Sequence, residues 1–390
     1  MRVIWIMNAG GLPLRKGGAA AGGDVRLYEV SRRWDSCYDQ LLLTTSGGEQ
    51  VFRMLGSTMK MQLLPASVFI KYEPFWAFNF YSYCITAINS VLRQSKLPKG
   101  DVVITASDYF CCVVPALRIK KRNPQTRWVA WIHHRTKSPK ERPGNPIVNR
   151  VMYFLQTWSL KKIAQNADVA CVIGKDTEDS CSAELIQYGM DSSSIISIQN
   201  GMSHKEVPQE EISKCVDAVM VGVRPNKGMY DIVPVWREVN RIRPGTTLRL
   251  MGRMSDTSVL EKDIAEAGLS DLITLIKPES GFLDTHEFYK MIKESRVMFA
   301  PSYEEGWGIA VCEAMACGLP VVAYDLPVYR KIFGDALLKI PIGDTSSFAQ
   351  TICRLLSSQT EYDEYRNKGL ECSKQYDWDT IAERDKEYLK

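Results

Sequence analysis

Two glutamates, Glu305 and Glu313, stand eight positions apart where a short apolar run is followed by a loop and a helical stretch. The run at 297–300 predicts a buried strand, and the turn residues that follow predict a helix from about Gly308 to residue 316. The N-terminus of a helix offers unpaired N–H groups and a partial positive charge of about half a unit, which together suit a diphosphate. Glu305 precedes that N-terminus and Glu313 lies about one and a half turns inside the helix. The pattern therefore predicts a diphosphate site flanked by two carboxylates.

A carboxylate on each side of a bound diphosphate could accept hydrogen bonds from hydroxyl groups. Glu305 would meet a sugar ring and Glu313 a ribose. Gly306 and Gly308, on either side of Trp307, would let the ligand approach the backbone closely, so we assign all three to the donor site. The alternative is that Glu305 is a solvated loop residue and Glu313 an exposed helix residue.

The string EGWGIAVCEAMACGLPVVAYD at 305–325 resembles the E-x(7)-E signature of the family-4 glycosyltransferases. These are retaining enzymes of the GT-B type, in which two Rossmann-like doubly wound domains face a cleft. In that family the first glutamate contacts the donor sugar and the second contacts the nucleotide ribose. The resemblance therefore implies a catalytic role for Glu305 and a donor-binding role for Glu313.

Two cations, Arg224 and Lys227, follow a predicted strand in the segment VMVGVRPNKG at 219–228. Positive charge at the end of that strand would stabilise a departing nucleotide diphosphate without a metal ion. The pair resembles the family's Arg-then-Lys element before a glycine, although Val223 stands where the family usually has the arginine and the spacing is shorter. We predict catalytic roles for both cations, and the alternative for Arg224 is a turn residue.

A glycine-rich segment at 9–23 follows the first predicted strand and ends in Gly22 and Gly23 at the start of a predicted helix. Glycines at such a junction let backbone N–H groups reach phosphates or a reacting sugar. The pattern is not G-x-G-x-x-G, and the acidic ribose partner is missing, which argues against an NAD oxidoreductase. The segment resembles the family's double glycine before the first helix, which implies donor contacts for both glycines. A flexible structural loop is the alternative.

The apolar run at 128–132 predicts a strand that ends at His133 and His134. A lone histidine is more often a packing residue than a functional one. In the family a histidine at the carboxyl end of this strand lies near the donor sugar. The resemblance therefore implies a catalytic role for His133, which directly follows the run, and His134 is the second candidate.

Three further segments resemble parts of the family's fold. IISIQNGM at 195–202 resembles the crossing into the second domain and adds Asn200 as a candidate, and LRLMG at 248–252 resembles a donor-side loop and adds Gly252. YDWDTIAERDKEYL at 376–389 resembles the terminal helix that returns to the first domain. The resemblance covers most of the chain, but its motifs are specific only after residue 200.

Short apolar runs alternate with longer helical stretches along the whole chain, which is the pattern of βα units around a parallel sheet. Six strands are predicted before a polar stretch at 203–214 and five after it. This predicts an α/β fold with two doubly wound domains: residues 1–200, with a C-terminal helix at 372–390 packing back on them, and residues 201–371. Ligands of such sheets bind beyond the carboxyl ends of the strands, so the site is predicted in a cleft between the domains. The predicted strands lie at 3–7, 41–44, 102–105, 128–132, 169–173, 195–198, 218–221, 248–251, 273–276, 297–300 and 320–323.

The 390 residues are 45% hydrophobic and 24% charged, without an apolar stretch long enough to span a membrane, which is the composition of a soluble globular protein. Eleven cysteines lie at scattered positions without a C-x-x-C pair. They predict neither a zinc site nor disulfides, and they favour a cytoplasmic setting. The net charge of +4 hides an asymmetry, because residues 1–200 carry 25 Lys+Arg against 15 Asp+Glu and residues 201–390 carry 24 against 30. The basic half predicts an anionic partner, either a charged substrate or a membrane surface, and a solvated face is the alternative.

The combined prediction is a retaining glycosyltransferase that moves a hexose-type sugar from a UDP or GDP donor to a saccharide or lipid-linked saccharide acceptor. The resemblance favours attack by the acceptor on the face that the diphosphate leaves. No acidic D-x-D pair stands in a context that suggests a donor metal, so the reaction is predicted to need no metal ion and no cofactor. A sugar-nucleotide epimerase of the same architecture and a non-catalytic nucleotide-sugar-binding subunit are the alternatives. No nucleic acid partner is predicted.

Aromatic and basic residues in the first domain suggest where an acceptor could be held. Residues 69–83 are dense in aromatics, and residues 135–162 mix cations with apolar side chains. Such a surface suits peripheral attachment to the inner face of an anionic membrane and a lipid-linked acceptor. A buried helix face and ordinary core aromatics are the alternative explanation for the same residues.

Overall fold

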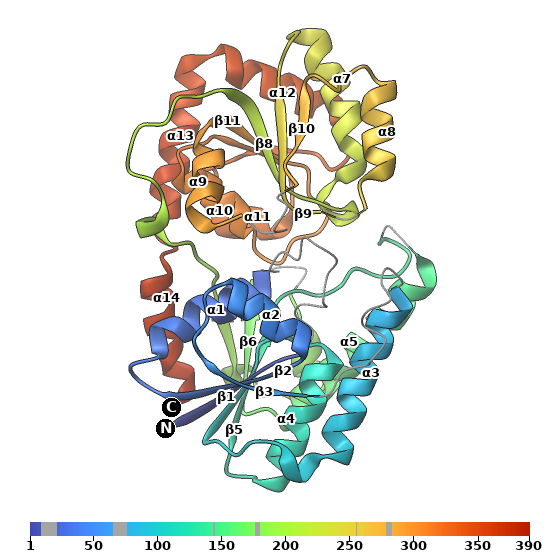
Figure 1. Cartoon of the computed structure of the whole chain (residues 1–390), viewed down its shortest axis with the longest axis vertical. Coiled ribbons are helices and arrows are strands. Elements are labelled where there is room, and N and C mark those ends of the chain that lie inside the picture. Colours follow the sequence, from blue (N-terminus) through green and yellow to red (C-terminus); the bar gives the residue numbers. More distant parts are fainter. Residues whose placement is uncertain (9–21, 65–75, 143–144, 176–179, 255, 278–282) are drawn as a thin grey trace. The chain divides into compact units, whose positions relative to one another are not determined.

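Seven parallel strands form the sheet of the first domain, in the order β3-β2-β1-β4-β5-β6-β7 (Figure 1). The computed structural model describes residues 1–8, 22–64, 76–142, 145–175, 180–254, 256–277 and 283–390. The central strands are buried along almost their whole length, because they are apolar throughout and helices cover both faces of the sheet. The strands are β1 (Arg2–Met7), β2 (Asp39–Thr44), β3 (Lys60–Leu63), β4 (Val102–Thr105), β5 (Arg127–Ile132), β6 (Val169–Ile173) and β7 (Ile195–Ile198).

The helices of this domain are divided between the two faces of the sheet. From β1 the chain moves outward to β3, and it then crosses back and continues from β4 to β7 in the opposite direction. Because parallel connections are right-handed, α1 and α2 cover one face, and α3, α4 and α5 cover the other. The helices are α1 (Gly22–Trp34), α2 (Ser46–Met54), α3 (Trp76–Leu92), α4 (Phe110–Arg122), α5 (Pro146–Asn166) and α6 (Ser182–Gln187).

The end of the chain returns to the first domain. One unit consists of Met1–Asn200 and Trp378–Lys390, and the other of Gly201–Asp377. The returning segment, α14 (Trp378–Arg384) and the 3-10 helix η7 (Asp385–Leu389), packs on the face that carries α1. It begins at Trp378, whereas the sequence predicted a start at residue 372.

A buried ion pair fastens the returning segment to α1. The Arg26 guanidinium bonds to the Asp385 carboxylate and also donates to the carbonyl oxygen of Gln199. The two charged side chains are 0% and 2% exposed, and the guanidinium lies 4.5 Å from the ring centroid of Trp131. Burial raises the pKa of Asp385, even though the charges of Arg26 and Arg384 lower it. The pair therefore joins α1, near the start of the chain, to the C-terminal segment through two side chains that are shielded from water.

We expect Arg26→Met to lower the free energy of unfolding by about 3–5 kcal/mol, because the Asp385 carboxylate would remain buried without its partner. The measurement is urea unfolding followed by circular dichroism. Arg241→Met is the matched control, since Arg241 pairs with Glu238 while 71% exposed, and such pairs contribute about 0.2–1 kcal/mol. Equal losses in the two variants would contradict the prediction, and Arg26→Met with Asp385→Leu should recover part of the loss.

Six parallel strands form the sheet of the second domain, in the order β10-β9-β8-β11-β12-β13. They are β8 (Val216–Val223), β9 (Leu248–Met254), β10 (Ile273–Leu275), β11 (Ser295–Ala300), β12 (Val321–Tyr324) and β13 (Leu338–Ile340). The helices are α7 (Ile232–Ile242), α8 (Ser258–Glu266), α9 (Thr285–Lys293), α10 (Ile309–Ala316), α11 (Pro327–Phe333), α12 (Thr345–Ser357) and α13 (Gln359–Ser373).

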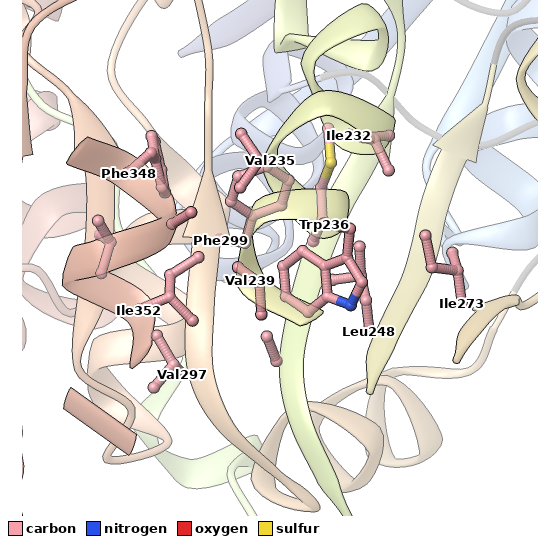
Figure 2. Packing of buried hydrophobic residues seen from close by; sticks show 14 of the residues in the cluster. Ile232, Val235, Trp236, Val239, Leu248, Ile273, Val297, Phe299, Phe348 and Ile352 are labelled. Atoms are coloured by element: carbon pink, nitrogen blue, oxygen red, sulfur yellow. The ribbon is translucent and has the colours of Figure 1, made fainter. Parts of the chain in front are cut away.

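The core of the second domain lies between its sheet and the helices α7 and α12, as Figure 2 shows. Phe299 on β11 meets Trp236 of α7 with ring centroids 5.6 Å apart and Phe348 of α12 at 4.9 Å. All three rings are fully buried. This packing fixes β11, and with it the loop that follows its carboxyl end.

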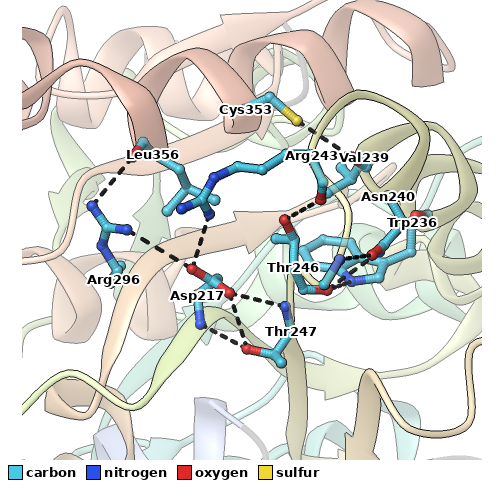
Figure 3. Close-up of polar contacts among 11 residues, drawn as sticks. Asp217, Trp236, Val239, Asn240, Arg243, Thr246, Thr247, Arg296, Cys353 and Leu356 are labelled. Atoms are coloured by element: carbon cyan, nitrogen blue, oxygen red, sulfur yellow. Dashed lines mark hydrogen bonds and ion pairs between the residues drawn. The ribbon is translucent and has the colours of Figure 1, made fainter.

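A polar cluster ties down the amino-terminal edge of the same sheet (Figure 3). The Asp217 carboxylate at the start of β8 accepts hydrogen bonds from the Thr247 amide at 3.0 Å and from Arg243 at 3.2 Å, and Arg296 lies 3.8 Å away. These contacts hold the turn between α7 and β9. The anchored edge is opposite the carboxyl ends of the strands, which stay available for a ligand site.

The two parallel sheets confirm the predicted α/β class with two domains. Two strands were missed, β3 and β13, and each lies at the edge of its sheet. Both are short and contain polar residues, KMQL and LKI, because one side of an edge strand can face water. Within the described ranges no helix combines the length and the apolar character that a membrane crossing requires.

Candidate functional site

The loop after β11 leads into α10 through a glycine that no other residue could replace without strain. Gly308 is the N-cap of α10 and has φ +100°. A Cβ atom at this position would lie 2.8 Å from the Tyr329 ring. The positive φ and the close ring together require glycine here, and they fix the direction in which the N-terminus of α10 points.

Three donors hold one oxygen of the Glu305 carboxylate. Its Oε1 accepts hydrogen bonds from the Lys227 ammonium, from Ser302 Oγ at 3.0 Å and from the Tyr329 hydroxyl at 3.2 Å. The side chain is only 11% exposed. Within the described residues no group donates to the other oxygen, Oε2. The carboxylate is therefore oriented through Oε1, and Oε2 is left to accept a hydrogen bond from a ligand.

The pKa of Glu305 lies below its ordinary value. Burial alone would raise this pKa, but the charge and hydrogen bond of Lys227, the hydrogen bond of Ser302 and the charge of Arg224 outweigh burial. Burial and the nearby Glu305 charge raise the pKa of the Tyr329 hydroxyl well above its usual value. This hydroxyl therefore stays protonated and donates a hydrogen bond to Glu305. Glu305 is thus an ionised acceptor at neutral pH.

Lys227 reaches Glu305 because two loops at neighbouring strand ends are locked together. β8 and β11 pair in parallel, so the loops that follow them lie at the same edge of the sheet. The carbonyl oxygen of Asn226 accepts hydrogen bonds from the amides of Tyr303 and Glu304 at 3.0 and 3.3 Å. A Cβ atom at Gly228, where φ is +82°, would collide with the carbonyl oxygen of Pro301. Only glycine at this position lets the two loops approach so closely.

A second carboxylate braces these loops from the side. The Asp231 carboxylate accepts hydrogen bonds from the hydroxyls of Tyr303 at 2.8 Å and Tyr324 at 2.7 Å. Burial and the Asp231 charge raise the pKa of Tyr303 to about 12, so its hydroxyl stays protonated. The Asp231 carboxylate is occupied by these two hydrogen bonds, so Asp231 is a structural residue next to the site.

The remaining predicted donor residues of the second domain differ in their surroundings. Glu313, on α10, is partly buried and accepts a hydrogen bond from the Tyr289 hydroxyl at 3.3 Å. The Trp307 ring is 2% exposed and packs against Phe333 and Tyr376, so a ligand could meet only its backbone. Gly252, like Gly308, has a positive φ, +80°, and neighbouring atoms that leave little room for a side chain. Gly306 lies in the loop before α10.

In the first domain the structure brings Gly23 and His133 into contact. A Cβ atom at Gly23 would lie 3.0 Å from His133 Nε2, and this nitrogen is 2.8 Å from the carbonyl oxygen of Ala106. Burial lowers the pKa of His133, and the charge of Arg26 lowers it further, whereas the Ala106 carbonyl and Asp108 oppose the shift. The ring is therefore neutral at pH 7, with Nε2–H donating to Ala106 and Nδ1 available as an acceptor.

For the other predicted residues of the first domain, the described part of the structure shows no group that is oriented for a ligand as His133 Nδ1 is. His134 uses its carbonyl oxygen to accept a hydrogen bond from Gln156 at 2.8 Å. Asn200 is buried and its Oδ1 lies 3.4 Å from Arg26, which places it with the ion pair at the C-terminus. Gly22 is exposed at the start of α1, and the glycine-rich segment at 9–21 lies outside the described residues.

The structure thus assembles two groups of predicted residues, one in each domain. Glu305 and Lys227 meet at the carboxyl ends of β8 and β11, and the charge of Arg224 helps to lower the pKa of Glu305. His133 and Gly23 meet at the edge formed by β4 and β5. The cleft in which the two groups would face each other stays a prediction.

Sequence reasoning selected Lys227 but missed three other hydrogen-bond partners of the two glutamates. Ser302, three positions before Glu305, could have been found by its proximity in the loop. Tyr329 lies 24 positions away from Glu305, and Tyr289 lies 24 positions away from Glu313. Each tyrosine lies on a different element from its glutamate, and no spacing rule links such residues, so only the fold reveals these two tyrosines.

We expect Tyr329→Phe to lower kcat/KM for sugar transfer about tenfold, since one hydrogen bond to a charged group contributes about 1.5 kcal/mol or more. The pKa of Glu305 should rise, so the acidic limb of the pH profile should move to higher pH. Tyr362→Phe is the control, because Tyr362 is buried on α13 in the same domain and donates no hydrogen bond to Glu305. A loss of stability without movement of the pH profile would contradict a positioning role.

Residues 208–371 match the family described as glycosyl transferases group 1. Among characterised proteins, the chain is similar to phosphatidyl-myo-inositol mannosyltransferase of Mycobacterium leprae, with 28% identity over 161 residues, 40% of this chain and 41% of that protein. It is also similar to GDP-mannose:cellobiosyl-diphosphopolyprenol alpha-mannosyltransferase of Xanthomonas oryzae, with 25% identity over 164 residues, 41% of this chain and 42% of that protein. The chain therefore spans less than half the length of these relatives.

Two solved structures resemble the whole chain. Sucrose-phosphate synthase from Thermosynechococcus elongatus has a TM-score of 0.77 at 16% identity, and the match covers 99% of this chain and 98% of that one. Anabaena Alr3699/HepE in complex with UDP-glucose has a TM-score of 0.73 at 16% identity, over 100% of this chain and 99% of that one. At these identities the likeness concerns the fold, and it confirms the predicted GT-B class.

Proposed function

We propose that this chain, whose residues 208–371 match the glycosyl transferases group 1 family, transfers a hexose-type sugar from a nucleotide-diphosphate donor to a saccharide acceptor with retention at the anomeric carbon. The observation that carries the proposal is the Glu305 carboxylate, ionised and held by Lys227 where the chain enters α10. A fixed anion beside a cation and a helix N-terminus suits a ligand that has hydroxyls at one end and a diphosphate at the other.

In the proposed reaction the bond between the anomeric carbon and the diphosphate oxygen breaks, and its electron pair goes to the diphosphate. Lys227, Arg224 and the N-terminus of α10 at Gly308 supply the positive charge that stabilises this leaving group. The acceptor hydroxyl attacks from the same face, and its proton passes to the departing phosphate oxygen. Glu305 Oε2 accepts a hydrogen bond from a donor-sugar hydroxyl, which orients the ring without a covalent bond to it.

Further donor contacts are proposed for residues that were predicted from the sequence. We propose that Glu313 binds the ribose of the nucleotide and that the neutral His133 ring contacts the donor sugar through Nδ1. Gly22 and Gly23 would allow close approach of the donor to the start of α1. Asn200 is better explained as a structural residue, because it lies with the buried Arg26 pair.

The comparisons support two donor classes and one acceptor class. One structural neighbour was solved with UDP-glucose, and one relative is named for GDP-mannose. The names of two relatives include phosphatidyl-myo-inositol and diphosphopolyprenol, which are lipid-borne groups. We propose a UDP- or GDP-hexose as the donor and a saccharide or lipid-linked saccharide as the acceptor. A lipid-linked acceptor would place the protein, as a peripheral protein, at the cytoplasmic face of a membrane.

A panel of UDP-, GDP- and ADP-sugars tests the proposed donor site. A ligand that binds the native state stabilises it by RT ln(1 + [L]/Kd), which is about 2.7 kcal/mol at one hundred times Kd. We expect one class of nucleotide sugar to raise the unfolding temperature of the wild type. In Glu305→Gln the nucleotide sugar should lose this effect, whereas the bare nucleotide should keep it. Product analysis with donor alone separates transfer from epimerisation, which the comparisons do not favour. Stabilisation by none of the donors would contradict the proposal.

We expect transfer activity to survive complete chelation of divalent metals, because Lys227 and Arg224 supply the charge that a metal ion would otherwise provide. The measurement is the initial rate before and after treatment with EDTA, followed by addition of Mg²⁺ or Mn²⁺. Full loss in EDTA with recovery on addition of metal would contradict the prediction. A rate unchanged within twofold in all three samples would support it.

A further inference from the structure

The layer formed by α3, α4 and α5 on the first domain has an unusual charge distribution. α4 carries four cations and α5 carries three, and none of the three helices contains an aspartate or a glutamate. α3 packs against α4, and α4 against α5 (Figure 1). The helices of the opposite face, α1 and α2, mix carboxylates with cations. Positive charge is therefore gathered on one face of this domain, by helices that contain no carboxylate side chain of their own.

Most of these cations form no salt bridge within the part of the domain that the structure describes. Lys120 forms an ion pair with Asp168 at 2.7 Å, and Arg122 donates to the carbonyl oxygen of Leu97 at 2.6 Å. The other five form no salt bridge with any residue that the structure describes: Arg118, Lys121, Arg150, Lys161 and Lys162. A group of such cations attracts an extended anionic surface more strongly than a single counter-ion.

The same layer carries the most exposed apolar side chains of the chain's described part. They are Leu92 on α3, 75% exposed, and Phe154 and Ile147 on α5, 69% and 63% exposed. Single exposed apolar residues are common on protein surfaces, but Phe154 and Ile147 share one helix within a cationic layer, which suits a partner that buries apolar groups.

α5 arranges apolar and cationic side chains on one face. Ile147, Val151 and Phe154 follow one another at spacings of four and three, so they form a stripe along the helix. Arg150 and Lys161 lie beside this stripe and are exposed. An apolar stripe with cations along its edge suits the interface of a bilayer, where the apolar groups can be buried while the cations meet negatively charged lipids.

We propose that the α3–α5 layer, with the α5 stripe at its centre, binds the surface of an anionic lipid bilayer. The inference rests on the proposed peripheral location at a membrane, but not on sugar transfer. A second copy of the chain is a poorer partner, because an interface between two identical layers would bring like charges together. Nucleic acid would use the cations but would leave aliphatic side chains such as Leu92 and Ile147 without a role.

Sedimentation with lipid vesicles tests the proposal on the full chain. We expect binding to vesicles of phosphatidylglycerol mixed with phosphatidylcholine, no binding to pure phosphatidylcholine, and loss of binding as salt increases. Ile147→Ser with Phe154→Ser should weaken binding at least tenfold, and so should Arg150→Glu with Lys161→Glu. All four side chains are exposed or lie at the helix surface, so these variants should fold.

Matched variants on the second domain serve as controls. Val259→Ser removes an apolar side chain that is 61% exposed, and Lys262→Glu reverses a charge that is 73% exposed. Both should bind vesicles as the wild type does. Failure of the wild type to bind anionic vesicles at low salt, equal binding to neutral vesicles, unchanged binding of the α5 variants or preferential binding of duplex nucleic acid would overturn the proposal. Donor turnover measured without vesicles should be unchanged in the α5 variants, which separates this inference from the proposed sugar transfer.

Discussion

Glu305→Gln is expected to lower kcat/KM for sugar transfer about 10²- to 10³-fold, the range seen when one preorganised electrostatic contact is removed from an active site. The substitution keeps the size of the side chain but leaves it only one oxygen. Lys227, Ser302 and Tyr329 all donate to the Oε1 position, so they would hold the amide oxygen there. The amide NH₂ would then occupy the Oε2 position and present a donor where the sugar hydroxyl needs an acceptor.

Two measurements separate this role from a general loss of structure. The affinity for the bare nucleoside diphosphate should stay within about twofold in Glu305→Gln, because the proposed contact of Glu305 is with the sugar. Glu287→Gln, an exposed glutamate on α9 in the same domain, should behave as the wild type in both assays. If Glu305→Gln kept transfer activity within a few-fold of the wild type, the assigned role of Glu305 would be wrong.

The parts of this site that were predictable from sequence are those encoded locally. Glu305, Gly308 and Glu313 lie within one loop-to-helix unit, where helix signals and the resemblance act over a few residues. The Lys227–Glu305 pair spans 78 positions, and it forms because β8 and β11 are neighbours in the sheet. Strand order is a property of the whole domain, so periodicity placed both residues at strand ends without showing that they touch.

The errors in the predicted fold have a similar origin. β3 and β13 gain their pairing from one neighbour at the edge of a sheet, and their short polar sequences carry little strand signal of their own. Trp307 was assigned to the donor site by its place in the motif, and that assignment stays a prediction for its backbone; the sequence did not show that its ring completes the aromatic packing around Phe333. Burial of a side chain depends on what packs against it from distant segments, which a local motif does not contain.

Lys227→Met is expected to impair binding of the diphosphate as well as the chemistry that follows. The variant removes a cation from the proposed phosphate site, and it leaves the buried Glu305 carboxylate without its main partner. We expect kcat/KM to fall about 10²-fold or more, and the affinity for the bare nucleoside diphosphate to fall with it. Lys262→Met, at a 73% exposed position on α8, is the control and should change neither.

The pH dependence of Lys227→Met follows from the sign of the pKa shift of Glu305. In the wild type the folded pKa lies below the ordinary value of 4.5, so this carboxylate adds stability above that pH and loses it as the pH falls through the folded pKa. Without Lys227, burial should raise the pKa, so the same group should destabilise the fold as the pH rises through 4.5. The acidic limb of kcat/KM should move to higher pH in the variant.

A double variant distinguishes the two roles of Lys227. Lys227→Met alone should lose about 1–3 kcal/mol of unfolding free energy at pH 7, because a buried carboxylate is left unpaired. Lys227→Met with Glu305→Gln should recover most of that stability, since the unpaired charge is gone. Diphosphate affinity should not recover, because the cation is still missing. Recovery of both would show that Lys227 acts only through Glu305, and recovery of neither would show that the ion pair does not hold this carboxylate.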